Sequence, residues 1–291
     1  MFLDIASRRK AEDIRRLLPS MYHQFKELAD VDITAEPMEV GPTCHYVMGG
    51  VEVDPDTEAA TGDVSGLFAA GEVAGGMHGS NRLGGNSLSD LLVFGRRAGA
   101  GAAAYVSGLA SRPTVSDADV DIAARAAVTP FDGGDSESPE NPYTVHHDLQ
   151  QMMNDLVGII RREGEVAEAI ARLQQLKERA AKVVVEGHRQ FNPGWHLAID
   201  LRNMLLVSEC VAKAALERTE SRGGHTREDH PRMEPTWRKQ LLVCIADGDG
   251  IRLEHQEQIP MREDLLALFE FDELEKYFTP GELSGYQGKK G

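Results

Sequence analysis

The chain has 291 residues and a formal net charge of −16, from 31 lysines and arginines against 47 aspartates and glutamates. Hydrophobic residues make up 41% and charged residues 27% of it, a balance that predicts a soluble globular protein and excludes a disordered chain. The acidic total argues against a nucleic-acid binder, which needs a basic surface to displace counterions. Cys44, Cys210 and Cys244 are far apart in the sequence, so no zinc site, redox dithiol or disulfide scaffold is predicted.

The N-terminal third is predicted to change from helix to strand and back to helix. Residues 11–29 have apolar side chains at helical spacing, and Pro19 is expected to break or kink this helix. Residues 31–65 are rich in valine, glycine, proline and aspartate, which favours strands and turns. The run G-L-F-A-A-G over residues 66–71 predicts a short buried strand, and helical periodicity returns over residues 88–106.

A glycine-rich loop joins that strand to the following helix. Six of the seventeen residues from 71 to 87 are glycines, and glycine lets a backbone approach a ligand closely, as in the ligand-binding loops of α/β folds. Arg82 stands among these glycines, where it can either grip a carboxylate or phosphate or brace the loop. Asn86 or Ser87 is expected to cap the helix, whose start is either an anion site or simply a capped end.

The second half of the chain is predicted to be a helical bundle followed by a hairpin. Residues 129–143 are rich in proline, glycine, serine and acids, which indicates a linker. Helical periodicity over residues 144–162, 164–187 and 195–219 then predicts an antiparallel bundle. Two β-prone runs flank an Asp-Gly turn within residues 241–254, which predicts a β-hairpin.

Four motifs, in this order, resemble those of the flavoprotein subunits of succinate dehydrogenase and fumarate reductase. They are P-T-C-H-Y-V-M-G-G (42–50), G-L-F-A-A-G-E-V (66–73), H-G-S-N-R-L-G-G-N-S-L (78–88) and R-T-E-S-R-G-G-H-T-R-E-D-H-P (218–231). As a set they are highly specific, although each alone would only be suggestive. The resemblance implies FAD as the cofactor and the interconversion of succinate and fumarate by hydride transfer.

The resemblance also implies roles for individual residues. His45 matches the histidine that hydrogen-bonds a carboxylate of the C4 dicarboxylic substrate, and Arg82 matches the arginine that clamps a substrate carboxylate. Glu72 matches the acid that holds the ribityl or ribose portion of FAD. Ser87 and Leu88 match the residues whose backbone N–H groups meet the pyrimidine edge of the flavin. Without the resemblance, a lone histidine such as His45 is more often a structural hydrogen-bonding residue.

The implied fold class is α+β: the C-terminal part of a FAD-binding α/β domain, then a helical bundle domain and a small β-hairpin segment. The expected boundaries are 1–36 for the tail of a capping domain, 37–110 for the closing segment of the FAD-binding domain, 111–143 for a linker, 144–233 for the helical bundle and 234–291 for the hairpin segment. The tract 218–227, including His225, is interpreted as an ion-pair network that holds the helical domain against the flavin domain.

Some parts of the family pattern have no counterpart in this sequence. These are the G-x-G-x-x-G loop that cradles the FAD pyrophosphate, the histidine that attaches the flavin and the proton-donating arginine, so the chain is expected to be the C-terminal half of the subunit. We therefore assign no catalytic residue and no metal ligand, and expect the isolated chain neither to hold FAD tightly nor to oxidise succinate. The apolar run 66–70 and the ridge Gly95, Gly99 and Ala103 are expected to be exposed and to favour association.

The implied partners are a C4 dicarboxylate and an iron-sulfur protein subunit, with membrane anchor subunits attached indirectly and no nucleic acid. The implied location is cytoplasmic, peripheral on the cytoplasmic face of the bacterial inner membrane. Two other interpretations stay open. One is an L-aspartate oxidase, in which the loop H-G-S-N-R has relatives, and the other is a catalytically silent helical module that docks on a partner subunit.

Overall fold

The computed structural model of the chain divides into two compact units, Met1–His45 and Tyr46–Gly291. It describes residues 1–41, 43–62, 64–132, 138–248 and 250–284. Part of the predicted linker, the Asp-Gly turn residue Asp249 and the end of the predicted hairpin segment lie outside the described residues. Across the described ranges, every helix is too short or too polar to cross a membrane.

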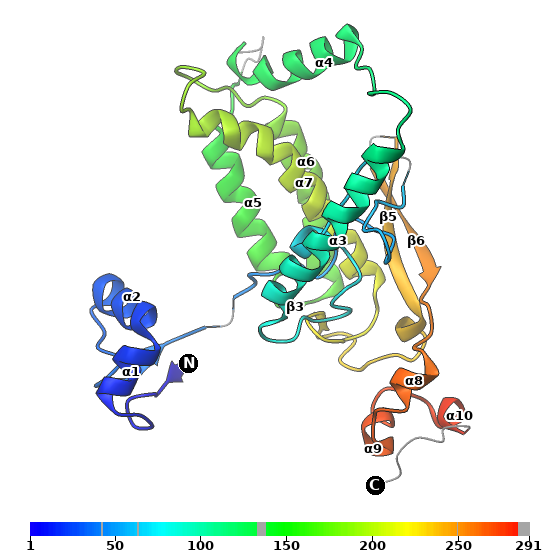
Figure 1. Cartoon of the computed structure of the whole chain (residues 1–291). Helices are drawn as coiled ribbons and strands as arrows, with labels where there is room; N and C mark the ends of the chain where they lie inside the picture. Colours follow the sequence, from blue (N-terminus) through cyan, green and yellow to red (C-terminus); the bar gives the residue numbers. More distant parts are fainter. Residues whose placement is uncertain (42, 63, 133–137, 249, 285–291) are drawn as a thin grey trace. The chain divides into compact units, whose positions relative to one another are not determined.

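The first unit consists of two helices whose flanking segments pair as short strands. Its helices are α1 (Ala11–Leu17) and α2 (Pro19–Ala29) (Figure 1). Its strands β1 (Phe2–Leu3) and β2 (Met38–Glu39) pair antiparallel. The predicted break is confirmed, because Pro19 begins α2 at a position where its missing N–H costs no hydrogen bond. The buried side chains of the unit are Ile14, Ile33 and Met38.

The first part of the second unit has little regular structure. The predicted buried strand at residues 66–71 is wrong, because Phe68 forms only a single bridge to Ala59 before the chain enters the 3-10 turn η1 (Gly71–Val73). Residues 31–65, expected to form strands and turns, contain β2 and isolated bridges. A strand needs neighbours for its backbone N–H and C=O groups, and the described residues supply few of them here.

Helix α3 (Asn86–Gly108) follows the glycine-rich loop. Its N-cap is Gly85, at φ 84° and without a capping side chain. The prediction that Asn86 or Ser87 caps this helix is therefore wrong, since these are its first two residues. Glycine adopts this left-handed conformation at no steric cost, so the turn from loop to helix needs no side-chain cap.

The predicted small-residue ridge of α3 is not where this helix approaches other backbone. A Cβ added at Gly95 or Gly99 would meet open space, whereas one added at Gly101 would clash with the carbonyl oxygen of Thr57. The exposure expected for the ridge thus agrees with the open space at Gly95 and Gly99. The close contact lies two residues further along the helix, where no four-residue step predicted it.

The expected linker contains a helix that periodicity did not reveal. Helix α4 (Asp117–Val128) precedes the 3-10 turn η2 (Thr129–Phe131). Ser116 caps α4 by accepting a hydrogen bond from the Asp119 N–H at 3.1 Å, and acidic residues occupy its first turn. A capping serine, acids near the helix N-terminus and several alanines favour a helix locally, even though none of its residues is buried.

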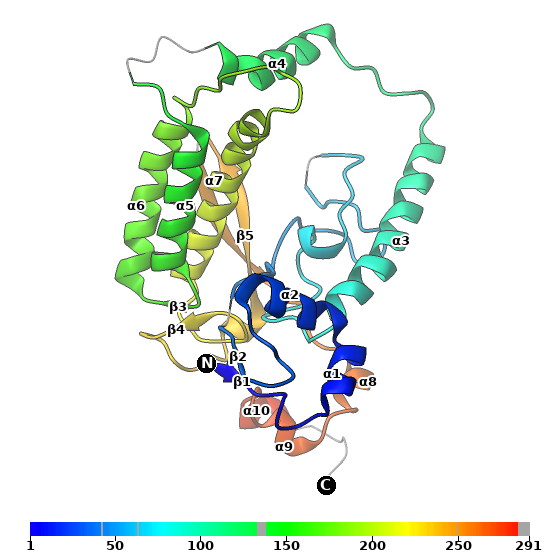
Figure 2. The same ribbon diagram turned by 90° about the vertical axis from the view of Figure 1, so that its left-hand side faces the viewer.

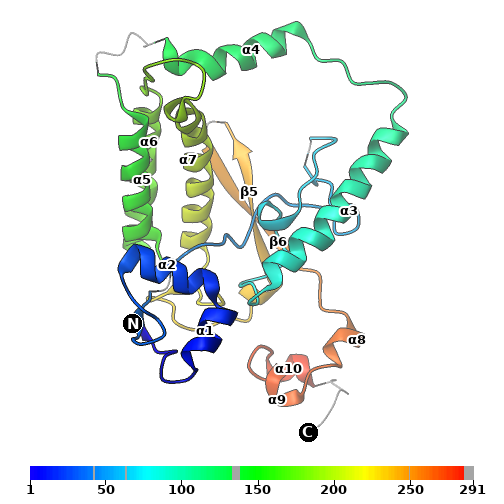
Figure 3. The ribbon, with the colours of Figure 1, turned by 60° about the vertical axis from the view of Figure 1, so that its left-hand side comes forward.

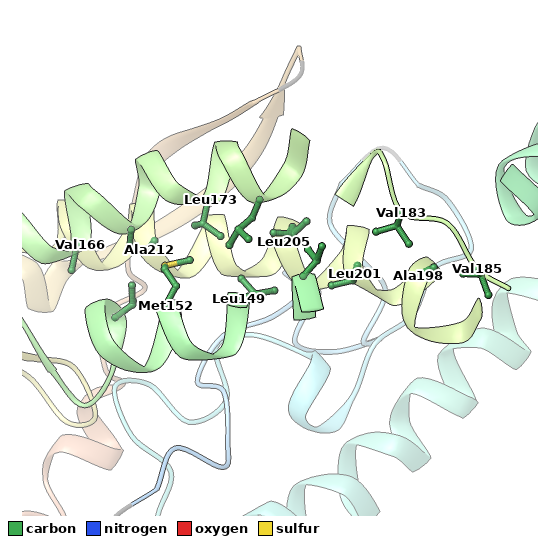
Figure 4. Packing of buried hydrophobic residues seen from close by; sticks show 14 residues of the cluster. Leu149, Met152, Val166, Leu173, Val183, Val185, Ala198, Leu201, Leu205 and Ala212 are labelled. Carbon is green, nitrogen blue, oxygen red and sulfur yellow. The ribbon is translucent and has the colours of Figure 1, made fainter. Parts of the chain in front are cut away.

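The predicted antiparallel bundle is confirmed by α5 (Pro142–Val157), α6 (Glu163–Ala180) and α7 (Pro193–Glu217), which lie side by side in Figure 2 and Figure 3. Asn141 and Asn192 cap α5 and α7, each directly before a proline at the first helical position. One continuous apolar core joins the three helices (Figure 4). Its buried members are Val145, Leu149, Met152, Val157, Val166, Ala169, Leu173, Leu176, Val183, Val185, Ala198, Leu201, Leu205 and Ala212.

The predicted hairpin is also confirmed. Strands β5 (Gln240–Asp247) and β6 (Gly250–Glu257) pair antiparallel from Gln240 opposite Glu257 to Asp247 opposite Gly250, and both contact α7. A 3-10 turn η3 (Trp237–Lys239) leads into β5.

Shorter elements complete the second unit. The parallel strands β3 (Ile160–Arg161) and β4 (Thr226–Arg227) connect the α5–α6 turn with the tract after α7. Between the hairpin and residue 284 the chain forms three one-turn helices that sequence analysis did not predict: α8 (Glu263–Leu266), α9 (Phe271–Leu274) and α10 (Pro280–Leu283). Capping boxes start α9 and α10, so local hydrogen bonds define elements too short to show a period.

Candidate functional site

Arg82 lies partly buried in the glycine-rich loop of the second unit. Its guanidinium carbon is 4.8 Å from the centre of the Tyr46 ring, and its Nη1 donates to the carbonyl oxygen of Leu83 at 3.3 Å. A guanidinium stacked on an aromatic face keeps its edge suited to a two-pronged pair with a carboxylate. The geometry is compatible with the predicted clamp, and the substrate role of Arg82 stays a prediction.

Three side chains that sequence analysis did not single out meet next to this arginine. The Nε2 atom of His78 is 3.0 Å from Oδ2 of Asp90, and the hydroxyl of Tyr46 is 3.1 Å from that Nε2 and 3.4 Å from that Oδ2. Asp90 is only 5% exposed, so its carboxylate depends on these donors. Burial, and then the neighbouring Asp90 carboxylate, raise the pKa of Tyr46, which keeps its hydroxyl protonated.

Only one weak signal in the sequence could have indicated this cluster. Tyr46 lies in one of the four family-like motifs and His78 opens another, but Tyr46 and Asp90 are 32 and 12 residues away from His78 along the chain. The three residues do not share one helix or strand, so no helix or strand period relates them. The cluster therefore depends on how the loop folds over the start of α3.

Glu72 anchors the segment that follows Tyr46. Its side chain is exposed, and Oε1 accepts a hydrogen bond from the Val47 N–H at 3.0 Å. This hydrogen bond joins the turn η1 to the segment that follows Tyr46. Further along the same two segments, Val51 and Ala74 form a parallel bridge. A carboxylate has acceptor capacity beyond one such bond, so Glu72 is chemically suited to a ribose or ribityl hydroxyl, and that role stays a prediction.

The start of α3 has the backbone donors expected of a site that binds the edge of a flavin. Ser87 and Leu88 are its second and third residues, and Leu88 is 68% exposed. The first N–H groups of a helix have no acceptor within the helix, and no side chain caps this one. Backbone donors at the positive end of a helix favour an electron-rich or anionic group. The residues present therefore fit the pyrimidine edge of FAD.

His45 is the last residue of the first unit, whereas Arg82, Glu72, Ser87 and Leu88 belong to the second. Its side chain is exposed, and its Nδ1 lies 3.3 Å from the carbonyl oxygen of Thr43. An exposed imidazole can donate from either nitrogen, depending on its tautomer. His45 is thus chemically able to hold a carboxylate, and this role also stays a prediction.

The predicted ion-pair network after α7 is present with Glu220 at its centre, and its role in holding the helical domain against the flavin domain stays a prediction. This glutamate is fully buried and accepts bonds from Arg218 at 2.7 Å and from Arg222 at 2.8 and 2.9 Å. The Glu234 N–H donates to it as well, at 2.8 Å. Burial alone would raise the pKa of Glu220, but the donors from Arg222, Glu234 and Arg218 outweigh it, so the pKa is lowered.

His225 has the structural role predicted for it. Its Nδ1 is 2.9 Å from a guanidinium nitrogen of Arg161, and its Nε2 is 3.0 Å from the carbonyl oxygen of Arg218. Burial lowers the pKa of His225, which favours a neutral ring that accepts from Arg161 and donates to the carbonyl. The ring thereby joins the α5–α6 turn to the end of α7.

The tract also touches the glycine-rich loop. The Gly224 N–H donates to the carbonyl oxygen of Ser80 at 2.8 Å. Gly223, at φ 59°, lies so close that an added Cβ would clash with the same oxygen. Ser80 is two residues before Arg82, so the helical part of the unit contacts the loop that presents the candidate arginine.

One group of potential metal ligands occurs within the described ranges. Glu163, Asp229 and His230 place ligand atoms within 4.8 Å of one another. Both oxygens of Asp229, however, accept bonds from the Arg227 guanidinium at 2.8 Å, and Asp229 also accepts from the Glu163 N–H. These contacts make Asp229 a partner of the buried arginine, and we assign no metal here.

Two cysteines that are remote in sequence are neighbours in space. The sulfur of Cys244, on β5, lies 3.9 Å from the carbonyl oxygen of Cys210, on α7. Both are free thiols. Spacing along the chain could not predict this pair, because it results from the packing of the hairpin on α7.

Two family models match the chain. The one described as "FAD binding domain" matches residues 1–88, and the one described as "Fumarate reductase flavoprotein C-term" matches residues 146–267. The matched ranges thus include the glycine-rich loop with Arg82 and most of the helical bundle and hairpin.

Curated relatives agree with these matches. The fumarate reductase flavoprotein subunit of Escherichia coli is 35% identical over 249 residues, which are 82% of this chain and 40% of that protein. The succinate dehydrogenase flavoprotein subunit of Coxiella burnetii is 36% identical over 245 residues, 81% of this chain and 41% of that protein. The chain therefore spans less than half the length of these relatives.

Solved structures are similar over most of the chain. Mycobacterium smegmatis Sdh1 in complex with UQ1 has a TM-score of 0.84 at 67% identity, with 98% of this chain and 47% of that chain covered. FrdA of the E. coli quinol fumarate reductase has a TM-score of 0.79 at 31% identity, with 88% of this chain and 44% of that chain covered.

The fold and the matched FAD-binding region define the class of flavoproteins, so the predicted cofactor FAD and the mixed fold of helices and strands are confirmed. The chain belongs to the family of succinate dehydrogenase and fumarate reductase flavoprotein subunits.

Proposed function

We propose that the full-length protein interconverts succinate and fumarate by hydride transfer between the dicarboxylate and FAD. The observation that carries this proposal is the placement of Arg82, which stacks on Tyr46 within the loop that leads into the uncapped start of α3. Arg82 can pair with an anion, and the start of α3 is suited to the edge of a flavin. The two are thus close in sequence and belong to one loop–helix junction. FAD, when bound, supplies the hydride acceptor or donor.

The residues of this chain would bind the dicarboxylate and FAD and orient them toward each other. Arg82 would pair with one substrate carboxylate and so orient the carbon atoms toward the flavin. His45 would hydrogen-bond a carboxylate. Glu72 would accept a hydrogen bond from the ribityl or ribose portion of FAD. The N–H groups of Ser87 and Leu88 would face the pyrimidine edge. We propose no proton donor among the residues of this chain.

We further propose that electrons leave through an iron-sulfur protein subunit, with membrane anchor subunits attached through it. This would place the protein on the cytoplasmic face of a bacterial inner membrane. Support comes from the relatives, which are named as flavoprotein subunits of fumarate reductase and succinate dehydrogenase. The expected domain boundaries at residues 36, 110, 143 and 233 are likewise part of this proposal.

Arg82→Lys in the full-length flavoprotein tests the proposal. Lysine keeps the charge but not the planar fork, so kcat/KM for succinate and fumarate should fall about tenfold to several thousandfold, which corresponds to roughly 2–5 kcal/mol. Flavin content should stay unchanged, because Glu72 and the start of α3 do not depend on that fork.

Arg96→Lys is the matched control, since Arg96 is an exposed arginine on α3. Rates should be expressed per bound flavin, and L-aspartate should be assayed beside succinate. Near-normal kcat/KM in the Arg82→Lys protein would remove Arg82 from the substrate site. A larger effect on aspartate oxidation than on succinate oxidation would instead favour an L-aspartate oxidase.

A further inference from the structure

A partly buried hydrogen-bonded cluster lies next to Arg82, and the proposal above gives its members no role of their own. Its members are Tyr46, His78 and Asp90, whose three polar atoms lie within 3.4 Å of one another. The rings of Tyr46 and His78 also meet edge to face, with their centres 5.5 Å apart. We propose that this cluster is a positioning unit that holds the guanidinium of Arg82 in place for a substrate carboxylate. The inference rests on the proposed function of Arg82.

The hydrogen bonds define the orientation of the Tyr46 ring. Asp90 is buried on α3, so its carboxylate provides a fixed acceptor for His78 Nε2–H and for the Tyr46 hydroxyl. In this arrangement the carboxylate accepts twice and the phenol hydroxyl donates. The next backbone N–H, that of Val47, is held by Glu72, so the ring is restrained at its hydroxyl and through its own backbone.

The ring in turn restrains the arginine. Arg82 lies in a loop in which six of seventeen residues are glycine, and glycine leaves a backbone with wide conformational freedom. The Tyr46 ring, 4.8 Å from the guanidinium carbon, supplies a flat surface that favours one orientation of the fork. A two-pronged pair with a carboxylate depends on that orientation, so loss of the ring should weaken dicarboxylate binding without removing any group that touches substrate.

The test compares Tyr46→Leu and Tyr46→Phe in the full-length flavoprotein. Fumarate affinity is measured by flavin absorbance, and kcat and KM are measured with succinate, per bound flavin. Loss of the cation–π contact in Tyr46→Leu should raise the Kd for fumarate about 2- to 30-fold. Tyr46→Phe keeps the ring and loses only the hydroxyl, so its effect should be smaller and should match that of Asp90→Asn. Tyr105→Leu is the matched control, because Tyr105 is on α3 and outside the cluster. It should leave the Kd unchanged.

A double-mutant cycle separates positioning from a general structural role. If Tyr46 acts through Arg82, Tyr46→Leu should have little further effect on the fumarate Kd in an Arg82→Lys background. Fully additive effects, or an unchanged Kd in Tyr46→Leu with normal flavin content, would overturn the inference. If Tyr46→Leu fails to fold, Tyr46→Phe and Asp90→Asn carry the same test, and an unchanged Kd in both overturns it.

Failure of this inference and failure of the proposed function give different results. If Arg82→Lys lowers kcat/KM but the Tyr46 and Asp90 variants bind fumarate normally, only the positioning role is wrong. If Arg82→Lys itself leaves kcat/KM and the fumarate Kd unchanged, the assignment of Arg82 to the substrate site is wrong, and the positioning role is overturned with it.

Discussion

Glu220 is a fully buried carboxylate among arginines, and its chemistry makes stability depend on pH. Its pKa is lowered in the folded chain, whereas in the unfolded chain it returns to about its ordinary value of 4.5. The unfolded state therefore takes up a proton first as the pH falls. The stabilisation from ionised Glu220 is fully present above the pKa of its carboxyl in the unfolded chain. It is lost as the pH falls through the lower pKa that this carboxyl has in the folded chain.

We predict that Glu220→Gln destabilises the chain at pH 7 by about 3–5 kcal/mol, since it leaves Arg218 and Arg222 without their buried partner. The difference from the unsubstituted chain should shrink as the pH falls below 4.5. Urea unfolding at a series of pH values measures both effects. Glu178→Gln, on the exposed side of α6, is the control. A difference that stays constant between pH 7 and the acid range would contradict the ion-pair explanation.

At the scale of elements, the tract after α7 and the glycine-rich loop are joined at Gly223 and Gly224. The backbone hydrogen bond from Gly224 to Ser80 connects the end of the bundle to the loop that presents Arg82. Gly223 allows this approach in two ways, by its left-handed φ of 59° and by its lack of a Cβ. A side chain at position 223 would therefore disturb the loop and not only the local backbone.

We predict that Gly223→Ala lowers kcat/KM of the full-length flavoprotein at least tenfold, because the Ser80 carbonyl must move and carries the loop with it. Left-handed strain alone costs about 1–2 kcal/mol of stability. Gly248→Ala isolates that strain, since Gly248 has a φ of 57° in the hairpin turn and open space around it. Equal losses of activity in the two variants, measured as steady-state rates per flavin, would show that the contact with Ser80 does not matter.

At the scale of the whole molecule, α3 presents an apolar surface that nothing in the described part of the chain covers. Among its exposed side chains, Leu88 is 68% and Leu92 is 77% exposed, with Leu91, Val93 and Val106 at half or more. Apolar surface of this extent usually marks an interface. The relatives are about twice as long as this chain.

We predict that the 291-residue chain, expressed alone, binds a hydrophobic dye and self-associates. Dye fluorescence and light scattering after size exclusion measure the two effects. Leu92→Ser should reduce both, whereas Val120→Ser on the exposed surface of α4 should have less effect. A monodisperse monomer without dye binding would show that the α3 surface is not an association site.

The sequence by itself determined those features that depend on neighbouring residues. Apolar spacing predicted the three bundle helices, an Asp-Gly turn between β-prone runs predicted the hairpin, and Pro19 predicted the break between α1 and α2. The four motifs identified the family, because residue types at given positions are retained in a motif whatever the surrounding fold. Helix periodicity and turn chemistry act over a few residues, so they can be recognised without tertiary structure.

Only the tertiary structure decided which distant residues meet. The run 66–71 looks like a buried strand, but a strand also needs partners that are set by the rest of the fold. Tyr46, His78 and Asp90 meet because the loop folds back onto α3, and Gly223 reaches Ser80 because the end of the bundle lies against the loop. Such contacts are set by packing between segments many residues apart. The composition or periodicity of one segment therefore does not predict them.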